Sequence, residues 1–263
     1  MAPCGACVGN DEVLTDQRIM VTGAASGIGL AICQGLAKAG ATLAMTDRDS
    51  VSLANTVDMF KGAAGYGAEL LHADEISALV GQALADGPIH GLVNCAGLYP
   101  LTDFLDLDVD EWDEVLGVNL RAPFLLTQAI ARSMVSSSIA GSVVNVSSTA
   151  STLARPGISH YAASKAGLNQ LTRVLAVELA PYRIRVNAVL PGVVETERVR
   201  ALGDSPEGAA DLIAKQARIP LERLGRPDDV VPMVRMLLSD QTSYCTGGLF
   251  TVDGGYSLGI ARV

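Results

Sequence analysis

The stretch Thr22-Gly23-Ala24-Ala25-Ser26-Gly27-Ile28-Gly29 joins a short aliphatic run, residues 18–22, to a segment of helical periodicity. Glycines in such a turn allow a tight reversal, let the backbone approach a pyrophosphate and let a helix pack closely on a strand. The N–H groups at the start of the helix attract the same anion. The stretch therefore predicts a strand, a phosphate-binding loop and a helix, and favours dinucleotide binding over a plain turn. The expected contacts are Gly23, Ser26, Gly27, Ile28 and Gly29.

The same alternation of strand-like and helix-like segments continues along the chain. Expected strands cover residues 18–22, 41–46, 68–73, 89–94, 142–147, 183–190 and 249–252. Expected helices cover residues 27–39, 50–61, 75–85, 109–134, 158–180 and 227–239. This pattern is typical of a parallel sheet covered by helices on both faces. We therefore predict the α/β class, with one doubly wound seven-stranded parallel sheet.

Composition limits the possible functions. The chain has 263 residues, 49% of them hydrophobic, and a net charge of −9, which excludes a disordered chain and argues against nucleic acid as a partner. No apolar run is long enough for a membrane span, and the first residues lack the pattern of a signal peptide. Five cysteines do not make a disulfide framework, so we expect reduced thiols and a cytoplasmic protein. Cys4 and Cys7 have the spacing of a redox or metal pair but no second ligand pair, and no metal is expected.

An acidic residue ends the second expected strand. Asp47 stands eighteen residues after Gly29, where a dinucleotide site places the acid that binds the adenosine ribose hydroxyls. Its carboxylate repels a 2′-phosphate, whereas the adjacent Arg48 could pair with one. The pair favours NAD and leaves NADP as the less favoured cofactor.

Two further segments carry candidate acid/base groups. Asn145-Val-Ser147-Ser148 ends a strand, and Tyr161-Ala-Ala-Ser-Lys165 follows Ser148 by thirteen residues on an expected helix. Residues four apart share a helix face, so the Lys165 ammonium can approach the Tyr161 phenol. A cation there, with a positively charged nicotinamide, is expected to lower the pKa of the phenol and make it a usable acid/base.

These motifs stand in one order along the chain: TGAASGIG, Asp47, NCAG at 94–97, Asn119, Ser148 with YAASK, and Pro191-Gly192. In this order the chain resembles the short-chain dehydrogenase/reductase family from about Leu14 to Tyr256, and in particular its NAD-preferring alcohol and polyol dehydrogenases. The resemblance implies a Rossmann-type sheet, a nicotinamide cofactor and a catalytic group of Asn119, Ser148, Tyr161 and Lys165. In that family the tyrosine passes the proton and the serine binds the substrate oxygen. The lysine binds the nicotinamide ribose and the asparagine holds a relay water.

The resemblance also implies cofactor contacts outside the glycine loop. Asp74, read as following the third strand, matches a position beside the adenine, and Val194 and Thr196 match contacts to the carboxamide. The other positions implied are Asn94, Ala96, Gly97, Pro191 and Gly192, with Tyr161 and Lys165 shared with the catalytic group. The chain departs from the family at Cys95, where a second asparagine is usual.

The expected organisation is a flexible tail at residues 1–13 and one NAD-binding catalytic domain at residues 14–263, with an irregular substrate loop at about 195–226. The expected activity is hydride transfer between NAD and a secondary alcohol or ketone. The alternatives are an NADPH-dependent 3-oxoacyl thioester reductase and a dinucleotide-binding protein without turnover. Apolar residues around more than one face of 109–134 predict a homodimer or homotetramer.

Overall fold

All seven strands lie in one sheet, and every neighbouring pair is parallel, as predicted. The order is β3-β2-β1-β4-β5-β6-β7, so the direction of winding reverses between β1 and β4. The strands are β1 (Arg18–Thr22), β2 (Thr42–Asp47), β3 (Ala64–Gly67), β4 (Gly91–Asn94), β5 (Ser142–Val146), β6 (Arg185–Pro191) and β7 (Leu249–Val252). The computed structural model describes residues 13–258, so Cys4, Cys7 and nearly all of the expected tail lie outside the described residues.

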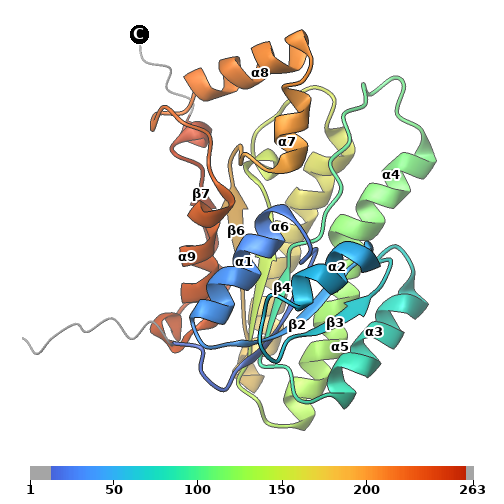
Figure 1. Ribbon diagram of the computed structural model, residues 1–263, viewed down its shortest axis with the longest axis vertical. Helices are drawn as coiled ribbons and strands as arrows, with labels where there is room; N and C mark the ends of the chain where they lie inside the picture. Colours follow the sequence, from blue (N-terminus) through green and yellow to red (C-terminus); the bar gives the residue numbers. More distant parts are fainter. Residues whose placement is uncertain (1–12, 259–263) are drawn as a thin grey trace, which may run out of the picture.

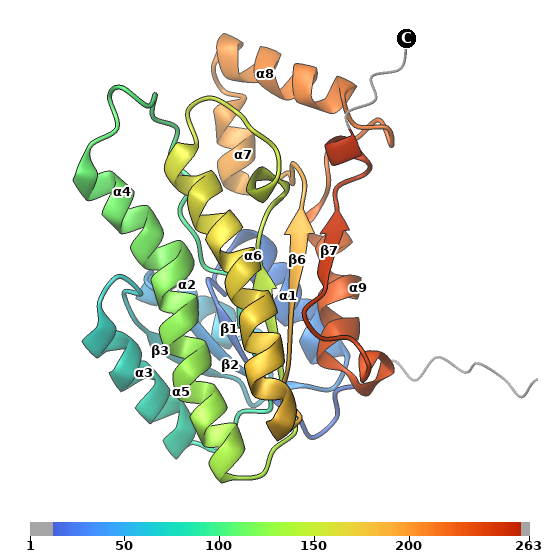
Figure 2. The same ribbon diagram turned by 180° about the vertical axis from the view of Figure 1, so that it is seen from behind.

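Helices cover both faces of the sheet. They are α1 (Gly27–Lys38), α2 (Ser50–Val57), α3 (Ala73–Ala85), α4 (Val109–Leu116), α5 (Ala122–Ser136), α6 (Ser159–Leu179), α7 (Glu197–Leu202), α8 (Pro206–Ala217) and α9 (Pro227–Leu238). Figure 1 shows α1, α2 and α9 on one face, and Figure 2 shows α3, α5 and α6 on the other, with α7 and α8 beyond the carboxyl ends of the strands. No helix within residues 13–258 is long and apolar enough to cross a membrane.

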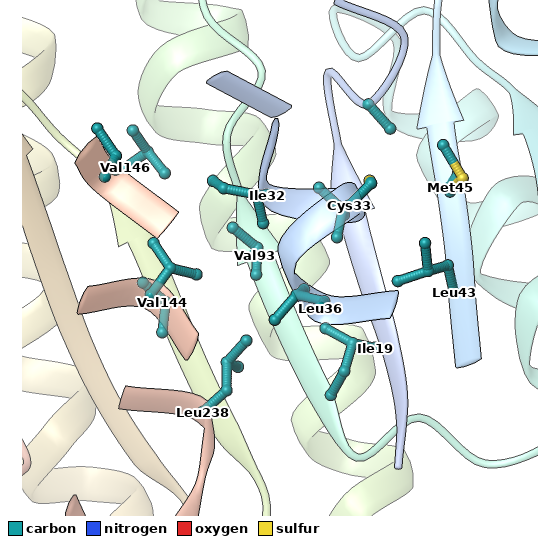
Figure 3. Packing of buried hydrophobic residues seen from close by; sticks show 14 of the residues in the cluster. Ile19, Ile32, Cys33, Leu36, Leu43, Met45, Val93, Val144, Val146 and Leu238 are labelled. Carbon is teal, nitrogen blue, oxygen red and sulfur yellow. The ribbon is translucent and has the colours of Figure 1, made fainter. Parts of the chain in front are cut away.

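The core forms on both sides of the sheet because successive side chains of a strand point to opposite faces. Ile19 and Val21 of β1 pack with α1 and α9, whereas Met20 between them packs with α3 and α5. All three are fully buried. Figure 3 shows Ile19 beside Leu36 of α1 in the first of these layers. Burial on both faces explains why the strands read as continuous apolar runs.

The third strand lies earlier than predicted, at Ala64–Gly67 instead of residues 68–73. Its backbone pairs with β2, with Tyr66 beside Thr46. The hydroxyl of Tyr66 accepts from Arg18 and donates to Asp86, both at 2.6 Å. The apolar run after it includes Leu70, which is buried as a loop residue. A short apolar run predicts burial without fixing the conformation of the backbone.

Two other segments also differ from the prediction. The expected helix at 109–134 is divided into α4, a five-residue π-helical turn (Gly117–Arg121) and α5. The expected irregular loop at 195–226 contains α7 and α8, whose N-caps Thr196 and Ser205 accept hydrogen bonds from backbone N–H groups. These caps explain the two short helices within a stretch rich in charge and glycine.

Candidate active site

The glycine loop lies where the strand order reverses. Gly23 has φ +65°, and a Cβ added to it would lie 2.9 Å from Cα of Ala96, which follows β4. A Cβ on Gly29 would lie 2.0 Å from the carbonyl oxygen of Gly23. Thr22 Oγ1 accepts from the N–H groups of Cys95 and Ala96, both at 3.0 Å, and so joins the ends of β1 and β4. The loop has no room for side chains, which matches the close backbone approach that a pyrophosphate needs.

The start of α1 faces a large cavity. Ser26 is the N-cap of α1, and its side chain makes no capping bond within the described chain. The first-turn N–H groups are therefore available to an anion. The cavity has a volume of about 690 Å³. The expected site residues that line it are Gly23, Ser26, Gly27, Ile28, Gly29, Asp47, Arg48, Ala96, Gly97, Ser148, Tyr161, Lys165, Pro191, Gly192, Val194 and Thr196.

The carboxylate of Asp47 is oriented by backbone donors. Its two oxygens accept from the N–H groups of Ala25 and Asp49, each at 3.1 Å. Arg48 Nη1 lies 4.0 Å from Glu69 Oε2, and its side chain is largely exposed. The neighbouring Asp49 caps α2 by accepting from the N–H groups of Val51 and Ser52. Asp47 therefore has a fixed orientation, whereas Arg48 is held only loosely.

Two expected cofactor contacts, Asp74 and Asn94, do not line the cavity. Asp74 lies in the first turn of α3 and does not line the cavity, because β3 ends seven residues before it. Glu69 and Leu70 line the cavity there instead. Asn94 is buried and donates to Asn145 Oδ1 at 2.8 Å and to a threonine hydroxyl at 3.2 Å, so its side chain supports the sheet. Placing the third strand correctly would have identified Glu69.

Tyr161, Lys165 and Ser148 meet at the other end of the cavity. Lys165 Nζ lies 5.8 Å from the centre of the Tyr161 ring and donates to the carbonyl oxygen of Val146 at 2.8 Å. Ser148 Oγ accepts from the N–H of Ala150 at 3.1 Å. The adjacent hydroxyl of Ser147 points to α6 and donates to the carbonyl of Lys165 at 3.3 Å. Strand alternation thus leaves Ser148 on the side of Tyr161.

Burial dominates the titration of this group. It raises the pKa of Tyr161 above its ordinary value, while a hydrogen bond with Ser148 and the charge of Arg155 act in the opposite direction. Burial also lowers the pKa of Lys165 to about 8. In the chain alone the net shift of the Tyr161 pKa is therefore upward, and the lowering expected from Lys165 together with a positively charged nicotinamide stays a prediction. At neutral pH Tyr161 holds its proton, which suits donation to a carbonyl oxygen.

Asn119 lies behind this group, in the π-helical turn. Its Nδ2 donates to the carbonyl of Leu98 at 2.8 Å and to Ser164 Oγ at 3.2 Å, and its Oδ1 accepts from the N–H of Leu98 at 2.8 Å. Asn119 is fully buried and does not itself line the cavity. A Cβ on Gly97 would lie 3.3 Å from Asn119 Oδ1 and 3.6 Å from Lys165 Nζ. Asn119 therefore fixes the loop after β4 beside Lys165.

Known proteins share this architecture and sequence. A family model described as Enoyl-(Acyl carrier protein) reductase matches residues 23–257. The human (3R)-3-hydroxyacyl-CoA dehydrogenase is 37% identical over 249 residues, covering 90% of this chain and 94% of the relative. Galactitol 2-dehydrogenase (L-tagatose-forming) of Cereibacter sphaeroides is 38% identical over 242 residues, covering 90% and 94%.

A solved structure agrees along nearly its whole length. It is a putative NAD(P) dependent gluconate 5-dehydrogenase from Beutenbergia cavernae with bound NADP, with a TM-score of 0.86 and 33% identity, covering 94% of this chain and 98% of that one. The matched region contains the glycine loop, Ser148, Tyr161 and Lys165. The chain therefore belongs to the short-chain dehydrogenase/reductase family, oxidoreductases that act on hydroxyl and keto groups.

Proposed function

We propose that the protein transfers a hydride between NAD and the carbon of a secondary alcohol or ketone, with Tyr161 as the acid/base. The observation that carries this proposal is the convergence of Ser148, Tyr161 and Lys165 in one cavity with the glycine loop. A dinucleotide-binding protein without turnover has no need of this group.

The residues present fit a nicotinamide dinucleotide. The start of α1 would hold the pyrophosphate, and Asp47 would accept from the adenosine ribose hydroxyls. Val194 and Thr196, which line the cavity beside the loop, would hold the carboxamide, and Lys165 would hold the second ribose. A Cβ on Gly27 would lie 3.3 Å from Thr196 Cγ2, so the glycine leaves space between the loop and Thr196. When bound, the nicotinamide supplies or accepts the hydride.

The chain's own residues position the substrate oxygen and move its proton. In the reducing direction Ser148 donates a hydrogen bond to the carbonyl oxygen, and Tyr161 transfers its proton to that oxygen as negative charge develops there. In the oxidising direction the ionised Tyr161 removes the hydroxyl proton. Lys165 stabilises the phenolate electrostatically, and Asn119 acts as a positioning residue through Leu98.

Asp47 supports NAD as the preferred cofactor. Its oriented carboxylate matches two ribose hydroxyls and repels a 2′-phosphate. The exposed Arg48 is the feature that supports the second candidate, an NADPH-dependent 3-oxoacyl thioester reductase. Two relatives also support this candidate. The gluconate 5-dehydrogenase structure has bound NADP, and the human relative is named for a hydroxyacyl-CoA substrate.

The test follows absorbance of the reduced cofactor when the protein is mixed with NAD and a panel of secondary alcohols, or with NADH and the ketones. We expect turnover that disappears in Tyr161→Phe. Turnover only with NADPH and a 3-oxoacyl thioester would favour the second candidate. Cofactor binding with no turnover on any panel member would contradict the proposed activity.

We also propose that the chain forms a homodimer or homotetramer and resides in the cytoplasm. Val115 and Val118 are buried within the chain, so the apolar excess in the region 109–134 is smaller than expected. Phe124 of α5 and Val177 of α6 are 40% and 76% exposed, which supports burial in a homodimer or homotetramer. Free cysteines at the described positions, among them the buried Cys33, are compatible with the reducing cytoplasm.

A further inference from the structure

The catalytic end of the cavity is rich in basic side chains, although the chain has a net charge of −9. Besides Lys165, these basic residues are Arg155, Arg198, Lys215 and Arg218, and the acid beside them is Glu197. Lys215 is paired with Asp211. None of the ion pairs among residues 13–258 includes the three arginines. Their charge is therefore available to a molecule inside the cavity.

Two of these arginines flank the reacting group. The guanidinium carbon of Arg198, in α7, lies 4.3 Å from the centre of the Tyr99 ring. The Tyr99 ring centre lies 6.1 Å from that of Tyr161. Arg155, in the loop before α6, is close enough for its charge to lower the pKa of Tyr161. Stacking on an aromatic face restrains a guanidinium that a solvated arginine would leave free.

We infer that the substrate carries an oxyanion, a carboxylate or a phosphate, that Arg155 and Arg198 bind while its hydroxyl or keto group meets Tyr161. A planar guanidinium with paired N–H donors matches either oxyanion in a bidentate geometry. This inference rests on the proposed function and names the substrate class of that site. It excludes neutral sugars and simple alcohols as the preferred substrates.

The pyrophosphate of the cofactor is the competing partner for Arg198, because Thr196 stands only two residues before it at the glycine loop. If Arg198 served the cofactor, its removal would weaken NADH binding equally with every substrate. Arg155 also borders a smaller hollow lined by Asp103, Asp106 and Asp211, but none of these three acids forms an ion pair with it. Substrate and cofactor affinities must therefore be measured separately.

The experiment compares oxyanions with neutral partners of the same shape. The probes are 2-oxo, 3-oxo and 5-oxo carboxylic acids with their methyl esters, and dihydroxyacetone phosphate with dihydroxyacetone. Binding is measured by fluorescence of the NADH-loaded protein, and turnover by absorbance. The variants are Arg155→Gln and Arg198→Gln. The matched control is Arg200→Gln, also in α7, which lies 3.6 Å from Glu195 and does not line the cavity.

We expect at least one oxyanion to bind tenfold or more tightly than its neutral partner. Each of the two variants should reduce that binding advantage at least fivefold without changing the affinity for the neutral compounds or for NADH. The control variant should keep the full advantage. Whether an acid or the phosphate responds identifies the oxyanion. Equal binding of every pair, or equal effects on acids and esters, would overturn the inference.

The same data separate this inference from the proposed function. Turnover of neutral ketones with no preference for oxyanions contradicts the inference alone. Selective oxyanion binding without turnover contradicts the proposed function alone. The preference should also weaken at high salt, because screening reduces attraction at a site open to solvent.

Discussion

Replacing Asp47 with asparagine should reduce the preference for NAD over NADP by at least tenfold. Asn keeps the size of the side chain and an oxygen that can accept from Ala25, so the change removes chiefly the negative charge. Hydrogen bonds to charged groups contribute about 1.5–3 kcal/mol and neutral ones about 0.5–1.5 kcal/mol, so NAD loses about 1 kcal/mol for each ribose hydroxyl.

NADP gains from the same substitution. A carboxylate about 4 Å from a phosphate charge costs about 1 kcal/mol in water and more where water is partly excluded. Arg48 can then turn to the phosphate, because its contact with Glu69 at 4.0 Å is a surface pair contributing about 0–1 kcal/mol. The combined change exceeds about 1.4 kcal/mol, which is tenfold in the ratio.

The assay is the ratio of kcat/KM for NAD to that for NADP, with the same substrate at saturation. Asp49→Asn is the matched control, because it removes the same charge two residues away and keeps an equally good N-cap for α2. An unchanged ratio in Asp47→Asn, or an equal change in the control, would show that Asp47 does not face the ribose.

Four other outcomes follow from the site. Tyr161→Phe should lower kcat by about 10²–10⁴ with NADH affinity retained, as measured by turnover and fluorescence titration. Gly29→Ala should lose cofactor affinity and about 1–3 kcal/mol of stability, because its Cβ would lie 2.0 Å from a carbonyl oxygen, whereas Gly81→Ala, with nothing within 4 Å, should lose neither. The kcat/KM for ketone reduction should be level at neutral pH and fall above about 8, where Lys165 loses its charge and Tyr161 later loses its proton. Light scattering at micromolar concentration should give a dimer or tetramer, with Val177→Glu shifted towards the monomer.

Wild-type turnover in Tyr161→Phe would remove that residue from the mechanism, and a reduction rate that rises with pH would reverse its assigned role. In the unfolded chain Lys165 has its ordinary pKa of 10.5, so the unfolded chain binds more protons than the folded one above pH 8. The contribution of Lys165 to the free energy of unfolding should therefore increase as pH rises from about 8 towards 10.5. A wild-type monomer would contradict the proposed association.

The sheet could be predicted from the sequence because its central strands are buried on both faces. Residues 18–22 and 249–252 were predicted as the structure has them, while the third strand was misplaced by several residues. At that edge the strand is Ala-Gly-Tyr-Gly, and only Tyr66 is buried. The apolar loop after it has the more strand-like sequence, so the strand is predicted too late. The acid expected to follow the strand was therefore Asp74 and not Glu69.

The spacing of Tyr161 and Lys165 could predict that they share a helix face, whereas the catalytic group as a whole is implied by the family resemblance. The direction in which the pKa of Tyr161 shifts could not be predicted from the sequence, because it depends on burial by segments far apart in the chain. Arg155 and Arg198 carry no local pattern, because their shared cavity exists only after α7 folds over the strand ends. The π-helical turn around Asn119 could not be predicted from the sequence either, because its residues continue the helical periodicity of α4 and α5.

The segment that carries α7 and α8, residues 195–224, leaves and rejoins the fold at neighbouring residues. Val194 and Gly225 form a parallel bridge, the N–H of Glu195 donates to Gly225 at 2.7 Å, and that of Gly225 donates to Val193 at 2.9 Å. With both ends fastened together, the segment between them can change length at little entropic cost, about 0.6 kcal/mol for each doubling. We therefore expect that versions of this segment with other α7 and α8 sequences, but with Thr196 kept, can be exchanged at these two ends to change substrate specificity.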